Sequence, residues 1–268
     1  MKELESLLLK LWEDFARLNP QAVKIHQLLE SRSEKIVNDH IAFRTFGVSQ
    51  VGITAFEKIF VDLGYQSKGE YQFKQKKLFA KHYEHQERGQ PKIFISELLV
   101  DQLSEKTQTI IRRLVSEIPP GLTETKDFCV SGRPWKVKYS EYQELMKESE
   151  YAAWMSAFGF RVNHFTVNVN ALESFSSLEG LNQFLKDQGF SLNSSGGEIK
   201  GGESDYLEQS STNAARIELE FEEGRFEIPS CYYEFAKRYP MPDGKLYQGF
   251  VEKSADKIFE STHWGGGS

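Results

Sequence analysis

The hydrophobic positions near the start of the chain repeat with helical spacing. Between residues 4 and 18, apolar side chains recur every three or four positions and charged side chains fill the positions between them. This pattern predicts an amphipathic helix that ends at Asn19-Pro20. A second short helix is expected over residues 22–29. Because each helix has one apolar face, we expect the two to form an N-terminal layer packed on a sheet.

Strand patterns begin after this layer. Apolar and polar residues alternate from position 40 to 47, which predicts a strand. A helical pattern follows over residues 53–63 and ends at Gly64, a residue type common at helix C-termini. Three more strands are predicted, at residues 65–73, 77–85 and 93–100. The expected order of elements between residues 36 and 100 is therefore β-α-β-β-β.

The middle of the chain, residues 101–160, has helical patterns instead. They cover residues 103–118 and 139–158, and Pro119-Pro120-Gly121 separates them. A small hairpin is predicted between the two helices, at residues 128–139. We interpret the whole region as a helical insertion rather than an independent domain.

The first pattern then returns, between residues 161 and 260. Residues 163–169 alternate as a strand does, and the next helix, over residues 178–185, is followed by Gly189-Phe190. A weak strand at 198–199 and stronger strands at 215–221 and 232–239 complete a second β-α-β-β-β unit. The last residues, 261–268, are rich in glycine, and we expect a flexible tail there.

Corresponding residues mark the two units as an internal repeat. Asp39-His40 opens the first unit, and Asn163-His164 opens the second 124 positions later (164 minus 40). Each unit closes on a strand that contains a glutamate, Glu97 in the first and Glu234 in the second. A repeat of this kind decides the architecture. We expect one α+β domain over residues 1–268, in which the two β-α-β-β-β repeats form half-barrels around a shared cleft.

Composition and charge narrow the class of function. The chain has 268 residues, 39% of them hydrophobic, which is enough to build a core. A net charge of −6 argues against a nucleic-acid partner, and the absence of a long apolar run argues against a membrane span. Two cysteines and an N-terminus without a secretory signal favour the cytoplasm. The expected partner is a small molecule, and the oligomeric state stays open.

The repeat predicts a candidate metal site. His40 and His164 occupy equivalent positions near the starts of their strands, so the symmetry should bring them together in the cleft. Glu234 is the expected third ligand, since a carboxylate among bulky strand residues is costly unless it is paired or bound to a metal. Two histidines and one glutamate form the facial arrangement of non-haem Fe(II) oxygenases. Either histidine taken alone is better explained as a structural residue of a half-buried strand, and it is their matching positions that favour metal binding.

Two more charged residues are candidates for the same cleft. Glu97, as the counterpart of Glu234, is expected there as a fourth ligand or a general base, and the alternative is a salt bridge or a solvated residue at a sheet edge. Arg44 lies four residues after His40 on the same face of the predicted strand, about 13 Å away. An arginine there could bind the far carboxylate of a substrate, because a guanidinium group donates two parallel hydrogen bonds to the two oxygens of a carboxylate. The alternative is a structural arginine.

Short motifs resemble one known family. Residues 39–44 resemble the His-x-x-x-Arg motif of the 2-oxoadipate dioxygenase/decarboxylase (hydroxyglutarate synthase) family, and residues 163–166 resemble its second-histidine motif. Residues 209–211, 233–238 and 244–247 are similar to further motifs of that family. The chain is shorter than the family's long form, and its residues 94–100 have no counterpart that we can place.

The resemblance implies both a fold and a set of roles. The fold would be of the vicinal-oxygen-chelate type, with Fe(II) held by His40, His164 and Glu234 and with Arg44 on the substrate carboxylate. The leading expectation is then a dioxygenase that uses O₂ to decarboxylate a 2-oxo acid such as 2-oxoadipate, giving 2-hydroxyglutarate. One alternative is an isomerase, lyase or hydrolase of a small carboxylic acid that uses Zn²⁺, Ni²⁺ or Mn²⁺. Another is a metal-free module that binds a small acid.

Overall fold

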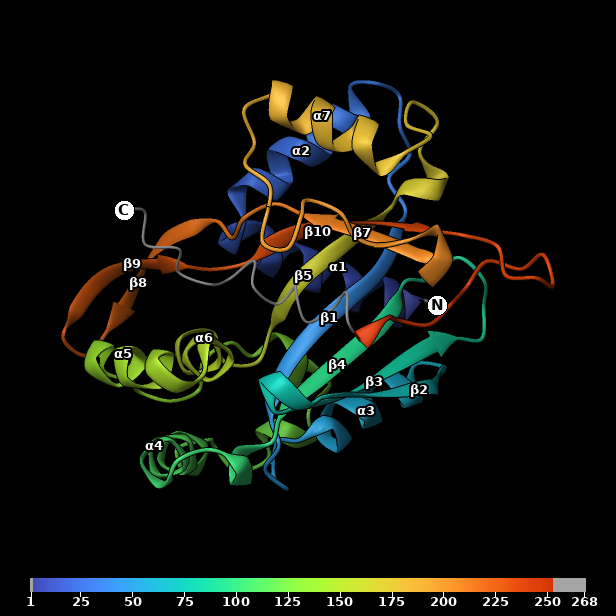
Figure 1. Cartoon of the computed structure of the whole chain (residues 1–268). Helices are drawn as coiled ribbons and strands as arrows, with labels where there is room; N and C mark the ends of the chain where they lie inside the picture. Colours follow the sequence, from blue (N-terminus) through green and yellow to red (C-terminus); the bar gives the residue numbers. More distant parts are fainter. Residues whose placement is uncertain (1, 253–268) are drawn as a thin grey trace.

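A curled sheet of eight strands forms the centre of the computed structural model, which describes residues 2–252 of the chain (Figure 1). The strands of this sheet are β1 (Asn38–Phe46), β2 (Tyr65–Phe73), β3 (Leu78–His85), β4 (Lys92–Leu98), β5 (Val162–Asn168), β6 (Lys200–Gly202), β7 (Leu207–Ser211) and β10 (Tyr232–Arg238). Their order across the sheet is β2-β3-β4-β1-β5-β10-β7-β6. The sheet mixes parallel and antiparallel pairs and curls into a half-barrel.

The strand order contains the repeat. β1 and β5 pair antiparallel at the centre, and each also pairs in parallel with the last strand of its own unit, β4 or β10. The crossover helices are α3 (Ile53–Asp62) in the first unit and α7 (Leu178–Asp187) in the second. The α+β class is confirmed, and the two units join edge to edge through β1 and β5 into one sheet.

The predicted strands of the second unit need correction. Residues 216–221 form β8 (Arg216–Phe221), which pairs with β9 (Gly224–Pro229) in a separate hairpin outside the main sheet. The strand that takes its expected place is β7, which the sequence analysis missed. Its residues Gln209, Ser210 and Ser211 are all buried although they are polar, so no alternation of apolar and polar residues marks the strand. The weak strand expected at 198–199 lies slightly later, as β6.

The N-terminal helices pack on the sheet as predicted. They are α1 (Lys2–Leu18) and α2 (Pro20–Glu30). Between them, the side chain of Asn19 accepts a hydrogen bond from the backbone N–H of Ala22, so the residue that ends one helix caps the next. Phe15 of α1 lies 5.1 Å from Phe165 of β5 between ring centroids. These contacts bury one face of α1 against the outer face of the sheet.

The insertion is helical, as expected, but its details differ. It contains α4 (Glu105–Ser116), α5 (Tyr139–Glu148) and α6 (Glu150–Phe158). The single helix expected at 139–158 is therefore divided at Ser149, whose side chain accepts a hydrogen bond from Ala152 N–H and caps α6. The hairpin predicted at 128–139 is wrong, because residues 126–130 form a 3₁₀ helix that buries the consecutive side chains of Phe128 and Cys129.

Helix α6 closes one end of the sheet beside β1. The Tyr151 hydroxyl donates to Ser96 O at 2.6 Å and accepts from Thr45 N–H at 3.0 Å, so it ties α6 to both β4 and β1. None of the helices within residues 2–252 is long and apolar enough to cross a membrane. The tail expected at residues 261–268 lies outside the described residues.

Candidate metal centre

Three side chains from three neighbouring strands meet on the inner face of the sheet. They are His40 of β1, His164 of β5 and Glu234 of β10, and one potential ligand atom from each lies within 4.8 Å of the others. Nε2 of His40 lies 3.3 Å from one carboxylate oxygen of Glu234, and Nε2 of His164 lies 3.5 Å from the other. All three residues are buried. The structure therefore brings together the three residues that the repeat singled out.

Strand register explains this convergence. His40 of β1 lies opposite Thr166 of β5, and Thr166 lies opposite Glu234 of β10, so these three residues form one row across the sheet. His164 comes two positions before Thr166 and therefore points to the same face. The Thr166 hydroxyl lies 3.1 Å from Nε2 of His40, which places it inside the group.

Two β-bulges orient the histidine rings. The pairing of β1 with β5 shifts register between Asn38 and His40, and again where Asn163 is skipped. A bulge redirects the side chain at that position. Asp39 thereby receives the Nδ1–H of His40 at 2.8 Å, and Asn163 receives that of His164 at 3.0 Å. With Nδ1 donating to an oxygen, each ring keeps Nε2 as an acceptor or a metal ligand.

The charges of the group suit a divalent cation. Burial opposes ionisation of Glu234, but the neighbouring histidines and the amide of Gln209 outweigh it and lower the pKa of this carboxyl group. Burial lowers the pKa of His164 to about 3, so its imidazole is neutral. For His40, hydrogen bonds to Asp39 and Glu234 outweigh burial and raise the pKa.

One oxygen of the buried carboxylate has no hydrogen bond. Gln209 donates to Oε1 of Glu234 at 2.6 Å, whereas Oε2 has no hydrogen-bond partner within residues 2–252. A buried carboxylate oxygen without a partner is costly. A divalent ion between Glu234 and the two Nε2 atoms would satisfy it. The residues therefore fit a metal with a two-histidine, one-carboxylate ligand set.

Arg44 lies on the inner face at the end closed by α6. Its side chain is 1% exposed, and NH1 donates to Glu150 Oε1 at 2.9 Å. The guanidinium carbon lies 4.8 Å from the ring centroid of Tyr151 and 5.2 Å from that of Trp154, so two aromatic rings hold it in place. These partners belong to the insertion, and the sequence offered no sign of them.

Tyr232 is another residue of the site, and no motif or spacing in the sequence predicted it there. Its ring stacks on His164 with centroids 4.6 Å apart. Its hydroxyl is buried and has no hydrogen-bond partner in the described part of the chain. Burial raises its pKa well above the usual tyrosine value, so the group stays protonated and is available as a donor.

Glu97 does not lie with this group, and the expectation that it shares the cleft is wrong. Its carboxylate accepts a hydrogen bond from Ile53 N–H at 2.8 Å and caps α3, on the outer face of the sheet. In the parallel pairs, His40 lies opposite Lys92 and His164 opposite Tyr232, which relates the last strands by 140 positions (232 minus 92). The counterpart of Glu234 is therefore Phe94. Glu97 is three positions further on, and an odd shift of this kind reverses the face.

A curled half-barrel sheet with two buried histidines and one buried carboxylate on its inner face places this chain among proteins with a candidate two-histidine, one-carboxylate metal site. The fold alone is shared with a candidate glyoxalase superfamily protein from Ralstonia eutropha JMP134, which is 20% identical with a TM-score of 0.76 over 90% of this chain and 83% of that one. This likeness supports the expected vicinal-oxygen-chelate type of architecture.

The chain belongs to the 2-oxoadipate dioxygenase/decarboxylase family, whose model matches residues 5–120 and 127–245. The chloroplastic 2-oxoadipate dioxygenase/decarboxylase of Arabidopsis thaliana is 37% identical over 91% of this chain and 73% of that protein. The resemblance found in the short motifs is thus confirmed.

Two crystal structures are similar along nearly the whole chain. One is the hydroxyglutarate synthase from Oryza sativa in complex with 2-oxoadipate, which is 36% identical with a TM-score of 0.93 and covers 97% of this chain and 92% of that one. The other, from Shewanella frigidimarina NCIMB 400, is named as a candidate hydrolase. It is 50% identical with a TM-score of 0.89, over 92% of this chain and 97% of that one.

Proposed function

We propose that this protein is an Fe(II)-dependent dioxygenase that decarboxylates 2-oxoadipate to 2-hydroxyglutarate. The observation that carries the proposal is the buried group of His40, His164 and Glu234, in a chain whose family relatives bear this activity in their names. The balance requires one O₂ consumed for each CO₂ released, with both oxygen atoms ending in the products. The cytoplasmic location expected from the sequence stays a prediction.

The three residues would hold the metal through Nε2 of each imidazole and one or both oxygens of Glu234. Iron, when bound, would supply the reactivity toward O₂ and a chelation site for the 2-oxo acid group. Asp39 and Asn163 accept a hydrogen bond from His40 and His164, and Gln209 donates one to Glu234, so the three ligand atoms stay directed at one point. Because all three ligands are buried, the surrounding protein keeps bulk water away from that point.

Arg44 would bind the carboxylate at the other end of the substrate. It is on the same face of β1 as His40 and about 13 Å along the strand, so an extended dicarboxylic acid reaches from the metal toward its guanidinium. Tyr151 and Trp154 hold the guanidinium plane, which orients a pair of N–H donors for a carboxylate. Tyr232, whose ring stacks on His164, adds a buried, protonated hydroxyl beside the metal group.

An oxygen electrode tests the proposal directly. Protein loaded anaerobically with Fe(II) should consume O₂ when given 2-oxoadipate and should release an equal amount of CO₂. His164→Ala, which removes one ligand, should abolish both. If iron-loaded protein consumes no O₂ with any acid in a panel of 2-oxo acids, the proposal fails. Retention of a bound Zn²⁺, Ni²⁺ or Mn²⁺ ion would then favour the redox-neutral alternative, in line with the name of the Shewanella relative.

A further inference from the structure

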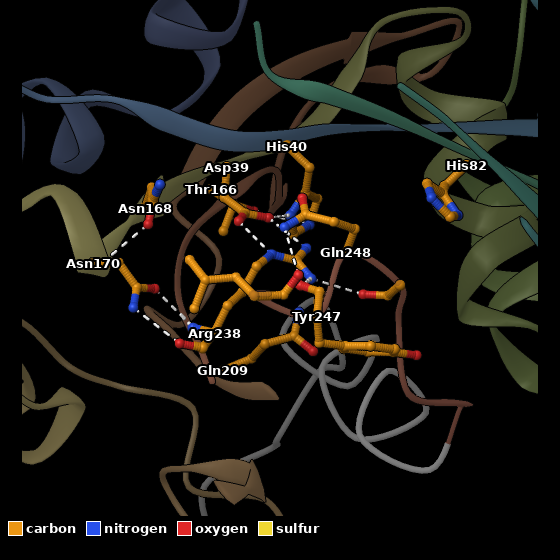
Figure 2. A network of polar contacts seen from close by, with 12 residues as sticks. Asp39, His40, His82, Thr166, Asn168, Asn170, Gln209, Arg238, Tyr247 and Gln248 are labelled. Atoms are coloured by element: carbon orange, nitrogen blue, oxygen red, sulfur yellow. Dashed lines mark hydrogen bonds and ion pairs between the residues drawn. The ribbon is translucent and has the colours of Figure 1, made fainter. Parts of the chain in front are cut away.

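A buried ion pair lies directly behind one of the two histidines. Arg238 of β10 donates from Nε to one oxygen of Asp39 at 2.6 Å and from NH2 to the other at 2.8 Å (Figure 2). The second of these oxygens also accepts the Nδ1–H of His40 at 2.8 Å. Asp39 is 4% exposed and Arg238 is 3% exposed. The arginine thus fixes both oxygens of the carboxylate that orients His40.

The backbone of Arg238 is fixed as well. Asn170 accepts from Arg238 N–H at 2.8 Å and donates to Arg238 O at 2.9 Å, and both contacts are visible in Figure 2. Asn170 N–H in turn donates to the side chain of Asn168 at 3.0 Å. These hydrogen bonds therefore fix the backbone from which the Arg238 side chain extends, at the end of β10.

The same guanidinium holds a second segment of chain. NH1 of Arg238 donates to Tyr247 O at 3.0 Å and to Gly249 O at 2.8 Å. We call residues 247–250 the C-terminal strap. Phe250, at its end, packs edge-on against the His40 ring with centroids 4.8 Å apart, and its N–H donates to the Tyr71 hydroxyl at 3.2 Å. One arginine therefore connects the strap to the residue that orients His40.

The second repeat lacks this arrangement at the matching place. Asn163, the counterpart of Asp39, provides His164 with a neutral amide oxygen. The position that corresponds to Arg238 in the first unit is 98 (238 minus 140), which is Leu98. In the second repeat, the fold therefore orients His164 without a charged partner behind the ring. Burying an ion pair is costly. Because the ion pair lies behind His40 and has no counterpart behind His164, its role must go beyond folding.

We propose that Asp39 and Arg238 are positioning residues for metal binding, in which Arg238 couples the orientation of His40 to the closure of the C-terminal strap over it. The carboxylate fixes the ring with Nε2 toward Glu234 and His164, and the strap covers the ring with Phe250. This inference rests on the proposed function only in that the three residues hold a divalent ion. Partners of metal-bound histidines typically change metal affinity about 10- to 100-fold when they are lost.

Competition between the protein and a chelator of known affinity tests the inference, with Co²⁺ alone as the probe. Asp39→Asn and Arg238→Leu should each weaken Co²⁺ binding about 10- to 100-fold and change the visible spectrum of the bound ion. Hydrogen exchange separates the two functions of Arg238. Arg238→Leu should speed exchange at the Phe250 amide, whereas Asp39→Asn should leave the carbonyl contacts of the strap intact and that amide protected.

Each single variant leaves one buried charge without its partner, so weaker Co²⁺ binding could come from misfolding. The double variant Asp39→Asn/Arg238→Leu controls for this, because it removes both charges. The double variant copies the uncharged arrangement of the second repeat, Asn163 and Leu98, and should fold with a higher melting temperature than either single variant. Its Co²⁺ affinity should nevertheless stay at least tenfold below that of the wild type. Glu97→Gln, a carboxylate-to-amide change on the outer face, is the matched control and should bind Co²⁺ as the wild type does.

The outcomes separate this inference from the proposed function. If the double variant binds Co²⁺ as tightly as the wild type, or if the Phe250 amide stays protected in Arg238→Leu, the coupling is overturned while the metal site stands. If the wild-type protein itself does not bind Co²⁺, or binds it equally well with His164→Ala, the metal site of the proposed function fails.

Discussion

Replacing Arg44 tests how the site selects its substrate. Arg44→Lys keeps a positive charge at the α6 end of the inner face. It removes the planar guanidinium, which can donate two parallel hydrogen bonds to a carboxylate. Arg44→Ala removes both the charge and the donors. Since Arg44 is not a ligand candidate and its ring contacts are with Tyr151 and Trp154, neither change should alter the metal content.

The size of the effect follows from the contacts of the guanidinium. Hydrogen bonds to a charged group contribute about 1.5–3 kcal/mol, which corresponds to roughly a 10- to 100-fold preference for a dicarboxylic acid over its monocarboxylic analogue. Glu150 already accepts from NH1 at 2.9 Å and competes for the same charge. We therefore expect the wild-type preference at about tenfold, falling to about threefold in Arg44→Lys and to none in Arg44→Ala.

The assay compares kcat/KM for 2-oxoadipate and for 2-oxohexanoate, which has the same chain length and lacks the far carboxylate. Iron content and melting temperature are measured on each variant, so that a loss of metal or of folding is not mistaken for a loss of selectivity. If Arg44→Ala still discriminates between the two acids as the wild type does, Arg44 does not bind the far carboxylate. Tyr232 would then be the next residue to test.

Three further variants test other parts of the structure. Glu150→Gln should lower KM for the dicarboxylic acid several-fold and leave KM for the monocarboxylic acid unaffected, because the Glu150 carboxylate then no longer competes with the substrate for the charge of Arg44. Hydrogen bonds, chiefly from the Ser104 side chain, lower the pKa of Glu148 to about 2, so its stabilising effect is complete above the usual glutamate pKa of 4.5 and is lost as the pH falls toward 2. Because this carboxylate is partly exposed, Glu148→Gln should cost only about 1 kcal/mol in urea unfolding at pH 7, with a smaller difference at pH 4. Phe15→Ala, on the outer face, should cost about 3–5 kcal/mol of unfolding free energy and leave Co²⁺ affinity unchanged.

The first repeat was predictable because its signals are local. Alternation predicts β1, strand-like segments predict β2 to β4 within a few residues of their bounds, and Gly64 marks the end of the helix between β1 and β2. The equivalence of His40 and His164 was also visible, since both follow a short polar residue at the start of an alternating strand. A sequence repeat predicts that equivalent strands approach one another, and here they are neighbours in the sheet.

The strand register and the positions of the β-bulges could not be predicted from the sequence. The orienting residues Asp39 and Asn163 take their places only because a bulge turns each toward the ring that follows it. Matching the closing strands of the two units by their glutamates puts Glu97 on the inner face, whereas its side chain lies on the outer face. Phe94, the actual counterpart of Glu234, shows no polar signal that a search for ligands would detect.

The differences between the repeats explain how two similar halves make one site. A half-barrel with exact symmetry would place a second carboxylate at position 94, which would occupy a further position on a bound ion. Phe94 instead packs against Phe250, with ring centroids 4.8 Å apart, and so becomes part of the wall that covers His40. The set of two histidines and one carboxylate leaves positions on a bound metal open to other ligands. The asymmetry between Glu234 and Phe94 is thus what would convert a symmetric metal cage into a site that a substrate and O₂ can share.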